Sequence, residues 1–226
     1  NAATGANTVT LTDAGAVTGN ANVETYVLAD GGGTTFTLGA DAQSVTTGNG
    51  ADTVDVGTRT ATGTFTTIAA DTIKLGNGAD VKGVDSGAGA GGAFTANTLE
   101  LASGASVTMT AAQNNSFTSA TAAGTETIAI SDTNDATGLA TIETYTLAAG
   151  TQTFTLGATG QNVTADSTGA TGAITIDTST LTSVTGTFDD NSGDDTIALT
   201  LSADGVNISS ADTTDVDTIA LANNVS

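Results

Sequence analysis

Apolar and polar residues alternate in short segments along the whole chain. Each segment reads as Thr, an apolar residue, a small or polar residue and a second apolar residue, as in Thr72-Ile73-Lys74-Leu75. A period of two places alternate side chains on opposite faces of a β-strand. The pattern predicts strands over residues 35–38, 53–56, 72–75, 98–101, 107–110, 127–130, 153–156, 173–176 and 196–201. The apolar spacing of an amphipathic helix is not sustained in any segment, so the sequence predicts no helix.

A longer repeat is superimposed on this alternation. Residues 23–28 match residues 142–147 at an offset of 119, and both segments carry the sequence Glu-Thr-Tyr. Gln43 and Gln161 match in the segment that follows, at an offset of 118. The sequence therefore predicts two related units, 1–119 and 120–226, that form one continuous structure.

About twenty short strands at near-regular spacing are compatible with two architectures. One is an irregular right-handed parallel β-solenoid, of the β-helix or β-roll kind, in which like side chains stack on like. The other is a pair of tandem antiparallel β-sandwiches, one for each unit. Phe is rare and Pro is absent, whereas a sandwich usually supplies bulky buried aromatics and Pro-marked edges. The sequence favours the solenoid.

Composition excludes several kinds of chemistry. The chain of 226 residues has 24 acidic and 3 basic residues, a net charge of −21, and no His, Cys, Pro or Trp. Imidazole and thiol catalysis, zinc sites built on His or Cys, and disulfides are therefore excluded. A chain so poor in cations is not expected to bind nucleic acid. No stretch of 18 apolar residues is present, so no membrane span is expected.

High charge and few large aliphatic residues are also typical of disordered chains. The 50 Thr, 15 Val and 10 Ile residues argue against disorder, because β-branched side chains favour strands. The chain does not begin with Met, which leads us to expect a processed product or an excised piece.

Two turns share the pattern Gly-Asn-Gly-Ala-Asp followed by a strand, at residues 48–52 and 76–80, and a weaker form lies at residues 191–195. The pattern resembles the nonapeptide of repeats-in-toxin β-rolls, in degenerate form. That resemblance implies calcium bound by turn carbonyls and Asp carboxylates between coils. The candidate calcium ligands are Asp52, Asp71, Asp80, Asp177, Asp194, Asp195 and Asp204.

The spacing of these acidic residues gives partial support. Asp52 and Asp71 are separated by nearly one expected coil, and Asp71 and Asp80 by about half of one. The alternative is simple turn chemistry, in which Asp caps the turn.

A second resemblance concerns the whole chain and rests most specifically on residues 23–28 and 142–147. The acidic, Thr-, Ala- and Gly-rich composition without Cys is similar to that of bacterial surface-layer proteins and large secreted adhesins. It implies an extracellular, cell-surface protein that associates with itself, and a cell-surface glycan is a further possible partner. Glu24 and Glu143 are expected to be exposed strand residues, with an inter-coil bond or a bound ion as the alternative. Tyr26 and Tyr145 are expected in the core or at a seam.

The function expected from these features is structural. The first and last predicted strands, 8–11 and 218–221, have the same sequence type, which suggests head-to-tail pairing of copies. No enzyme activity is expected. The alternative is a carbohydrate-active or carbohydrate-binding β-helix protein, which would use paired Asp residues such as Asp194 and Asp195. It would also need exposed aromatic and basic side chains, which the sequence scarcely supplies.

Overall fold

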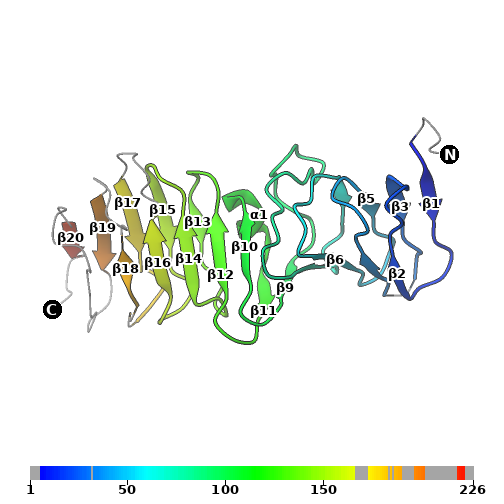
Figure 1. Cartoon of the computed structure of the whole chain (residues 1–226). Coiled ribbons are helices and arrows are strands. Elements are labelled where there is room, and N and C mark those ends of the chain that lie inside the picture. Colours follow the sequence, from blue (N-terminus) through cyan, green and yellow to red (C-terminus); the bar gives the residue numbers. More distant parts are fainter. Residues whose placement is uncertain are drawn as a thin grey trace.

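The computed structural model describes residues 6–31, 33–165, 173–182, 184, 186–189, 196–201 and 218–221. Their short strands stack into coils that follow one another in sequence order along one long axis (Figure 1). Within these residues every pairing of named strands is parallel. The fold is a parallel β-solenoid, as predicted, and the alternative of antiparallel sandwiches is wrong.

The strands belong to four sheets. The first contains β1 (Thr8–Thr10), β3 (Thr25–Val27), β5 (Ser44–Thr46) and β7 (Phe65–Thr66). The second contains β2 (Ala16–Thr18), β4 (Thr35–Thr37), β6 (Thr53–Gly57), β8 (Thr72–Leu75), β9 (Thr98–Leu101) and β11 (Ser119–Thr121). The third contains β10 (Ser106–Met109), β12 (Thr127–Ile130), β14 (Thr144–Leu147), β16 (Asn162–Ala165) and β18 (Phe188–Asp189). The fourth contains β13 (Ala136–Thr137), β15 (Gln152–Thr155), β17 (Ala173–Asp177), β19 (Thr196–Leu201) and β20 (Thr218–Leu221).

The coils differ in length although their strands stay in register. Thr8 pairs with Thr25 on the following coil. Thr72 pairs with Thr98 in the same way, but the chain that joins these two residues is much longer. Since the strands keep their pairing, the difference is taken up by the turns at the corners, and the solenoid is irregular.

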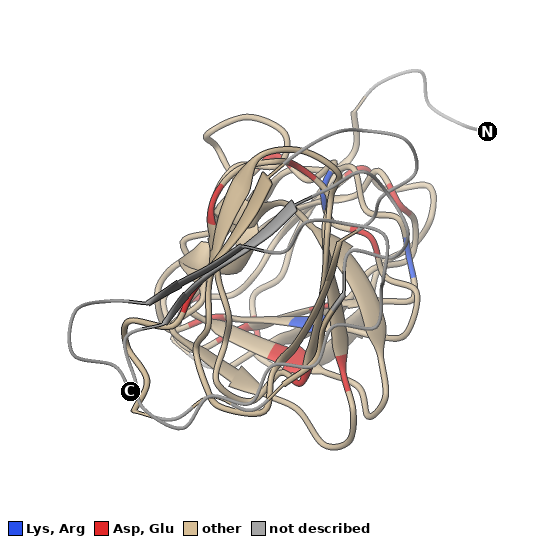
Figure 2. Ribbon diagram, turned by 90° about the vertical axis from the view of Figure 1, so that its left-hand side faces the viewer, with Lys and Arg blue, Asp and Glu red and all other residues tan. Residues whose placement is uncertain are grey.

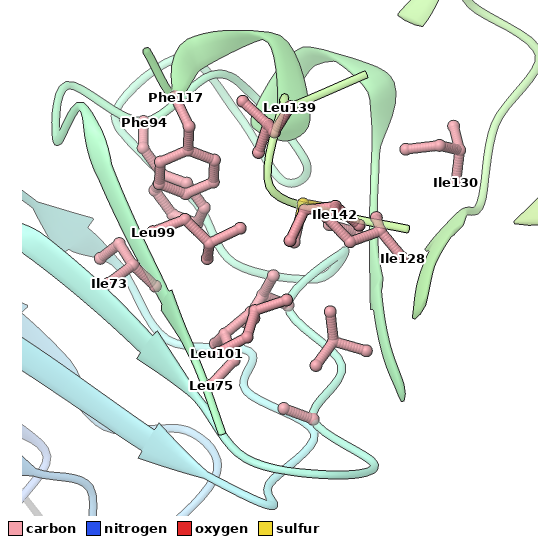
Figure 3. Packing of buried hydrophobic residues seen from close by; sticks show 14 of the residues in the cluster. Ile73, Leu75, Phe94, Leu99, Leu101, Phe117, Ile128, Ile130, Leu139 and Ile142 are labelled. Carbon is pink, nitrogen blue, oxygen red and sulfur yellow. The ribbon is translucent and has the colours of Figure 1, made fainter. Parts of the chain in front are cut away.

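The core is built from ladders of like side chains. Strand burial alternates, so that in β8 and β9 the second and fourth residues are buried. Val54, Ile73 and Leu99 occupy paired positions on successive coils, and all three are fully buried. Figure 3 shows Ile73, Leu99 and their neighbours pointing into the space between the strands. Stacked aliphatic residues fill most of this thin core, and eight buried Phe and Tyr side chains complete it.

Two glycine pairs allow the backbones of successive coils to touch. A Cβ placed on Gly39 would lie 1.8 Å from the carbonyl oxygen of Gly19. The same distance separates a Cβ on Gly157 from the carbonyl oxygen of Gly138. Gly157 is the repeat counterpart of Gly39, so the close approach recurs in both units. Any side chain at these positions would force the coils apart.

One short helix corrects the sequence prediction, which contained none. Helix α1 (Ala111–Ser116) begins after Thr110, whose side chain and that of Gln113 form a capping box. The Asn114 side-chain amide donates to the carbonyl of Thr137 at 2.7 Å, which fixes the helix against β13. The helix therefore lies beside β13, the first strand of the fourth sheet (Figure 1).

Candidate functional site

Acidic side chains join successive coils by accepting backbone N–H groups. In four cases the residue immediately before a strand offers a carboxylate to the equivalent residue one coil earlier. The pairs are Asn7 N–H to Glu24 Oε2 at 2.7 Å, Thr34 N–H to Asp52 Oδ1 at 2.6 Å, Asp52 N–H to Asp71 Oδ1 at 2.9 Å, and Glu126 N–H to Glu143 Oε2 at 3.0 Å. These carboxylates stabilise strand ends and are themselves stabilised by the N–H donors.

Asp52 and Asp71 are brought together on neighbouring coils, as their spacing in the sequence predicts. Both are buried. Besides the inter-coil bonds, Asp52 Oδ2 accepts from Gly48 N–H at 3.1 Å. Asp71 Oδ2 accepts from the Thr47 hydroxyl at 2.6 Å and from Ile68 N–H at 2.7 Å. All four carboxylate oxygens therefore have protein donors, and this arrangement corresponds to the turn-capping alternative.

Asp80 and Asp177 lie apart from this pair. Asp80 is paired with Thr60 and Thr108 through isolated bridges, and its Oδ2 forms an ion pair with Lys82 at 2.9 Å. Asp177 ends β17, and its Oδ1 accepts from Ser179 N–H at 2.8 Å. The other predicted ligands, Asp194, Asp195 and Asp204, lie outside the described residues.

Within the described part of the chain, no three acidic side chains converge as a metal-binding group would. Calcium at the Gly-Asp turns stays a prediction. In the described turns, protein donors already occupy the carboxylates of Asp52 and Asp71.

Glu24 is exposed, as expected, whereas Glu143 is half-buried, and both form the inter-coil bond that was the alternative expectation. Both precede their strands rather than lie in them. The bond from Asn7 N–H holds the pKa of Glu24 below its ordinary value. Glu126, which sequence reasoning missed, is fully buried. It stands at the repeat position of Asn7, and this correspondence was the signal that could have revealed it.

The two repeat units share further polar contacts. Tyr26 and Tyr145 are both buried, and each hydroxyl accepts the N–H of the residue six positions earlier, at 2.6 and 2.7 Å. Burial is the main cause that raises the pKa of Tyr145. Gln43 and Gln161 each accept two N–H groups and donate to two carbonyls of the preceding coil. The repeated sequence thus encodes a repeated set of hydrogen bonds.

The three cationic side chains of the chain are all paired with acidic ones. Arg59 contacts Asp41 at 3.4 Å, Lys74 contacts Glu100 at 2.9 Å, and Lys82 contacts Asp80. Figure 2, which looks along the stack, shows acidic residues spread around its perimeter rather than gathered on one face. Most of the negative charge therefore has no cationic partner in the protein.

The surface offers little for a sugar ligand. All eight aromatic side chains, six Phe and two Tyr, are at most 5% exposed. Arg59 borders an open hollow with Thr37, Thr58 and Thr60, but its guanidinium is held by the Leu38 carbonyl and by Asp41. No aromatic surface is left on which a sugar ring could stack.

Comparisons with known proteins add no relative. No family model matches the chain, and no match was found among curated proteins or solved structures. Among the described residues, the structure contains no helix of the length and apolar character required to cross a membrane.

Proposed function

We propose that the chain is part of an extracellular structural protein of the surface-layer, matrix-filament or adhesin type, stabilised by calcium, and that it has no enzyme activity. The observation that carries this proposal is the stack itself. Its coils follow one another in sequence order and pair with their neighbours, so its length grows with the number of coils (Figure 1). Such a rod spans distance and offers a repeating surface.

Self-association is the second part of the proposal. A parallel strand at the end of a stack has one row of N–H and C=O groups that can receive a further coil. That coil can belong to a continuation of the chain or to another copy, and a head-to-tail contact of this kind extends into a filament or lattice row. The charge of −21 opposes the contact at low salt, so salt and calcium should promote it.

The carbohydrate-active alternative is disfavoured by the buried aromatic residues and by the pairing of all three cations. A cell-surface glycan remains in the proposal as an attachment partner recognised through hydroxyl groups of the Thr-rich surface. A glycan array combined with a reducing-sugar assay separates the two functions. Release of reducing sugar would favour the enzyme.

Electron microscopy of the purified chain, with and without millimolar calcium, tests the structural proposal. We expect filaments or lattice rows in calcium and fewer of them in chelator. Sedimentation across a salt series provides the quantitative measurement. A chain that stays monomeric in every condition, with β1 and β20 protected from hydrogen exchange, would contradict self-association.

A further inference from the structure

A buried carboxylate oxygen of Glu126, near the start of the second unit, has no hydrogen-bond partner among the described residues. Glu126 is fully buried. Its Oε1 accepts from Gly104 N–H at 3.0 Å and from Ala123 N–H at 3.2 Å. Its Oε2 is also buried and has no hydrogen-bond partner among the described residues. Desolvation of a carboxylate oxygen without a donor or a cation costs free energy, so this oxygen requires a partner.

The two coils that flank Glu126 carry further side-chain oxygen atoms, on Ser103 and Glu143. The carboxylate of Glu143, one coil further, accepts the backbone N–H of Glu126 through Oε2 at 3.0 Å. Ser103 lies on the other side, in the coil before Glu126. A Cβ placed on Gly124 would lie 2.9 Å from Ser103 Oγ and 3.1 Å from Glu126 Oε1, so both oxygens border Gly124. Ser103 and Glu126 therefore approach each other at Gly124, and the Glu143 side chain reaches the backbone of Glu126 from the next coil.

The protein has no cation of its own to place there. The sequence contains three Lys and Arg residues and no His. Each of the three is engaged elsewhere, with Asp41, Glu100 or Asp80. No Lys or Arg side chain therefore pairs with Glu126 or Glu143.

We propose that Glu126 and Glu143 bind a calcium ion between successive coils, with Ser103 Oγ and water molecules as further ligands. Calcium takes six to eight oxygen ligands in flexible geometry, which suits a site assembled from three coils. Magnesium fits less well because it demands octahedral geometry and holds its water tightly. With two carboxylates the affinity belongs to the weak extracellular class, with a Kd of about 10⁻⁴–10⁻³ M.

The first repeat unit provides a matched control. Glu24 is the counterpart of Glu143, and it accepts the same inter-coil bond. The counterpart of Glu126 is Asn7, a half-buried residue that supplies no second carboxylate. The two units therefore share the inter-coil bond, whereas a carboxylate at the position of Glu126 is present in the second unit alone.

The test is a calcium titration of the full chain, followed by thermal unfolding at constant ionic strength, with magnesium in parallel. We expect calcium to raise the Tm of the wild-type chain more than magnesium does. Glu126→Gln and Glu143→Gln should each weaken the calcium response by at least about tenfold. Glu24→Gln should leave it unchanged. Gln has the shape of Glu, and Glu126→Gln should be at least as stable as wild type in chelator, because no buried charge remains.

Terbium luminescence locates the ion directly. Terbium replaces calcium and emits when a nearby tyrosine is excited, and Tyr145 is close in sequence to Glu143. Emission should depend on Glu126 and Glu143 and persist in Glu24→Gln. A calcium response that survives in Glu126→Gln would overturn this site but leave calcium elsewhere in the chain, as at the Gly-Asp turns. A wild-type chain without any calcium-specific response up to about 10 mM would overturn both, since that exceeds the expected Kd about tenfold. Neither result depends on filament formation, so the structural proposal is tested separately.

Discussion

Replacement of Asp71 tests whether the buried carboxylates are structural bridges between coils. Asp71→Ala removes the acceptor of three donors, namely the Thr47 hydroxyl and the N–H groups of Asp52 and Ile68. Asp71 is fully buried, so the donors would have no ready access to water. A bond to a charged group contributes roughly 1.5–3 kcal/mol. After allowance for relaxation, the expected loss in free energy of unfolding is about 4–6 kcal/mol.

Asp71→Asn distinguishes the contributions of the two carboxylate oxygens to stability. Its amide oxygen can still accept from Asp52 N–H, but its NH₂ group then faces the N–H of Ile68. We expect Asp71→Asn to lower the free energy of unfolding by about 2–3 kcal/mol, which is less than the loss for Asp71→Ala. The exposed residue Asp13 accepts one contact, from the adjacent Thr12 hydroxyl, so Asp13→Ala should change stability by less than about 0.5 kcal/mol.

Urea unfolding in chelator and in calcium measures these losses, and hydrogen exchange over residues 34–72 shows whether they are local. If Asp71 is a structural bridge, the loss in free energy of unfolding should be the same in chelator and in calcium. A loss below about 1 kcal/mol for Asp71→Ala would refute the bridge. A loss that appears in calcium alone would instead identify Asp71 as a calcium ligand.

Three further outcomes follow from the geometry. The bond from Asn7 lowers the pKa of Glu24 below its ordinary value, so its stabilising contribution is present above the unfolded pKa and lost as pH falls through the folded one. Glu24→Gln should therefore reduce the fall of the urea midpoint in acid. Gly39→Ala should cost at least about 3 kcal/mol in urea unfolding because its Cβ would strike a backbone carbonyl, whereas Gly83→Ala, whose nearest contacts are 3.3–3.4 Å, should cost much less. Burial raises the pKa of Tyr145 above 10.0, so stability should fall as pH rises past that value, and ultraviolet absorbance should show Tyr145 ionising together with unfolding.

The strands could be predicted because their alternation is local. Residues 72–75, 98–101 and 127–130 form β8, β9 and β12 with the predicted bounds. Helix α1 was missed because it is too short to show a helical period. Its signal was Thr110 with Gln113 three residues later, which is a capping box.

The candidate site was only partly predictable, because it depends on which turns lie side by side. The spacing of Asp52 and Asp71 indicated a stacked pair, but it could not show that backbone N–H groups would occupy both carboxylates. Glu126 does not belong to any of the sequence motifs recognised in the chain. Its burial depends on the preceding coil, which contributes Gly104 as a donor, and that contact follows from coil lengths that the sequence does not mark.

The direction of the strand pairing has a mechanical consequence. The backbone hydrogen bonds between coils run along the long axis of the stack, so a pull along that axis stretches them lengthwise and does not shear a whole sheet at once (Figure 1). The rod should therefore lengthen by releasing one coil at a time. The short coil from Thr8 to Thr25 and the long one from Thr72 to Thr98 would release roughly 60 and 90 Å of extended chain. Under load the molecule would act as an extensible tether whose increments are set by the lengths of its coils.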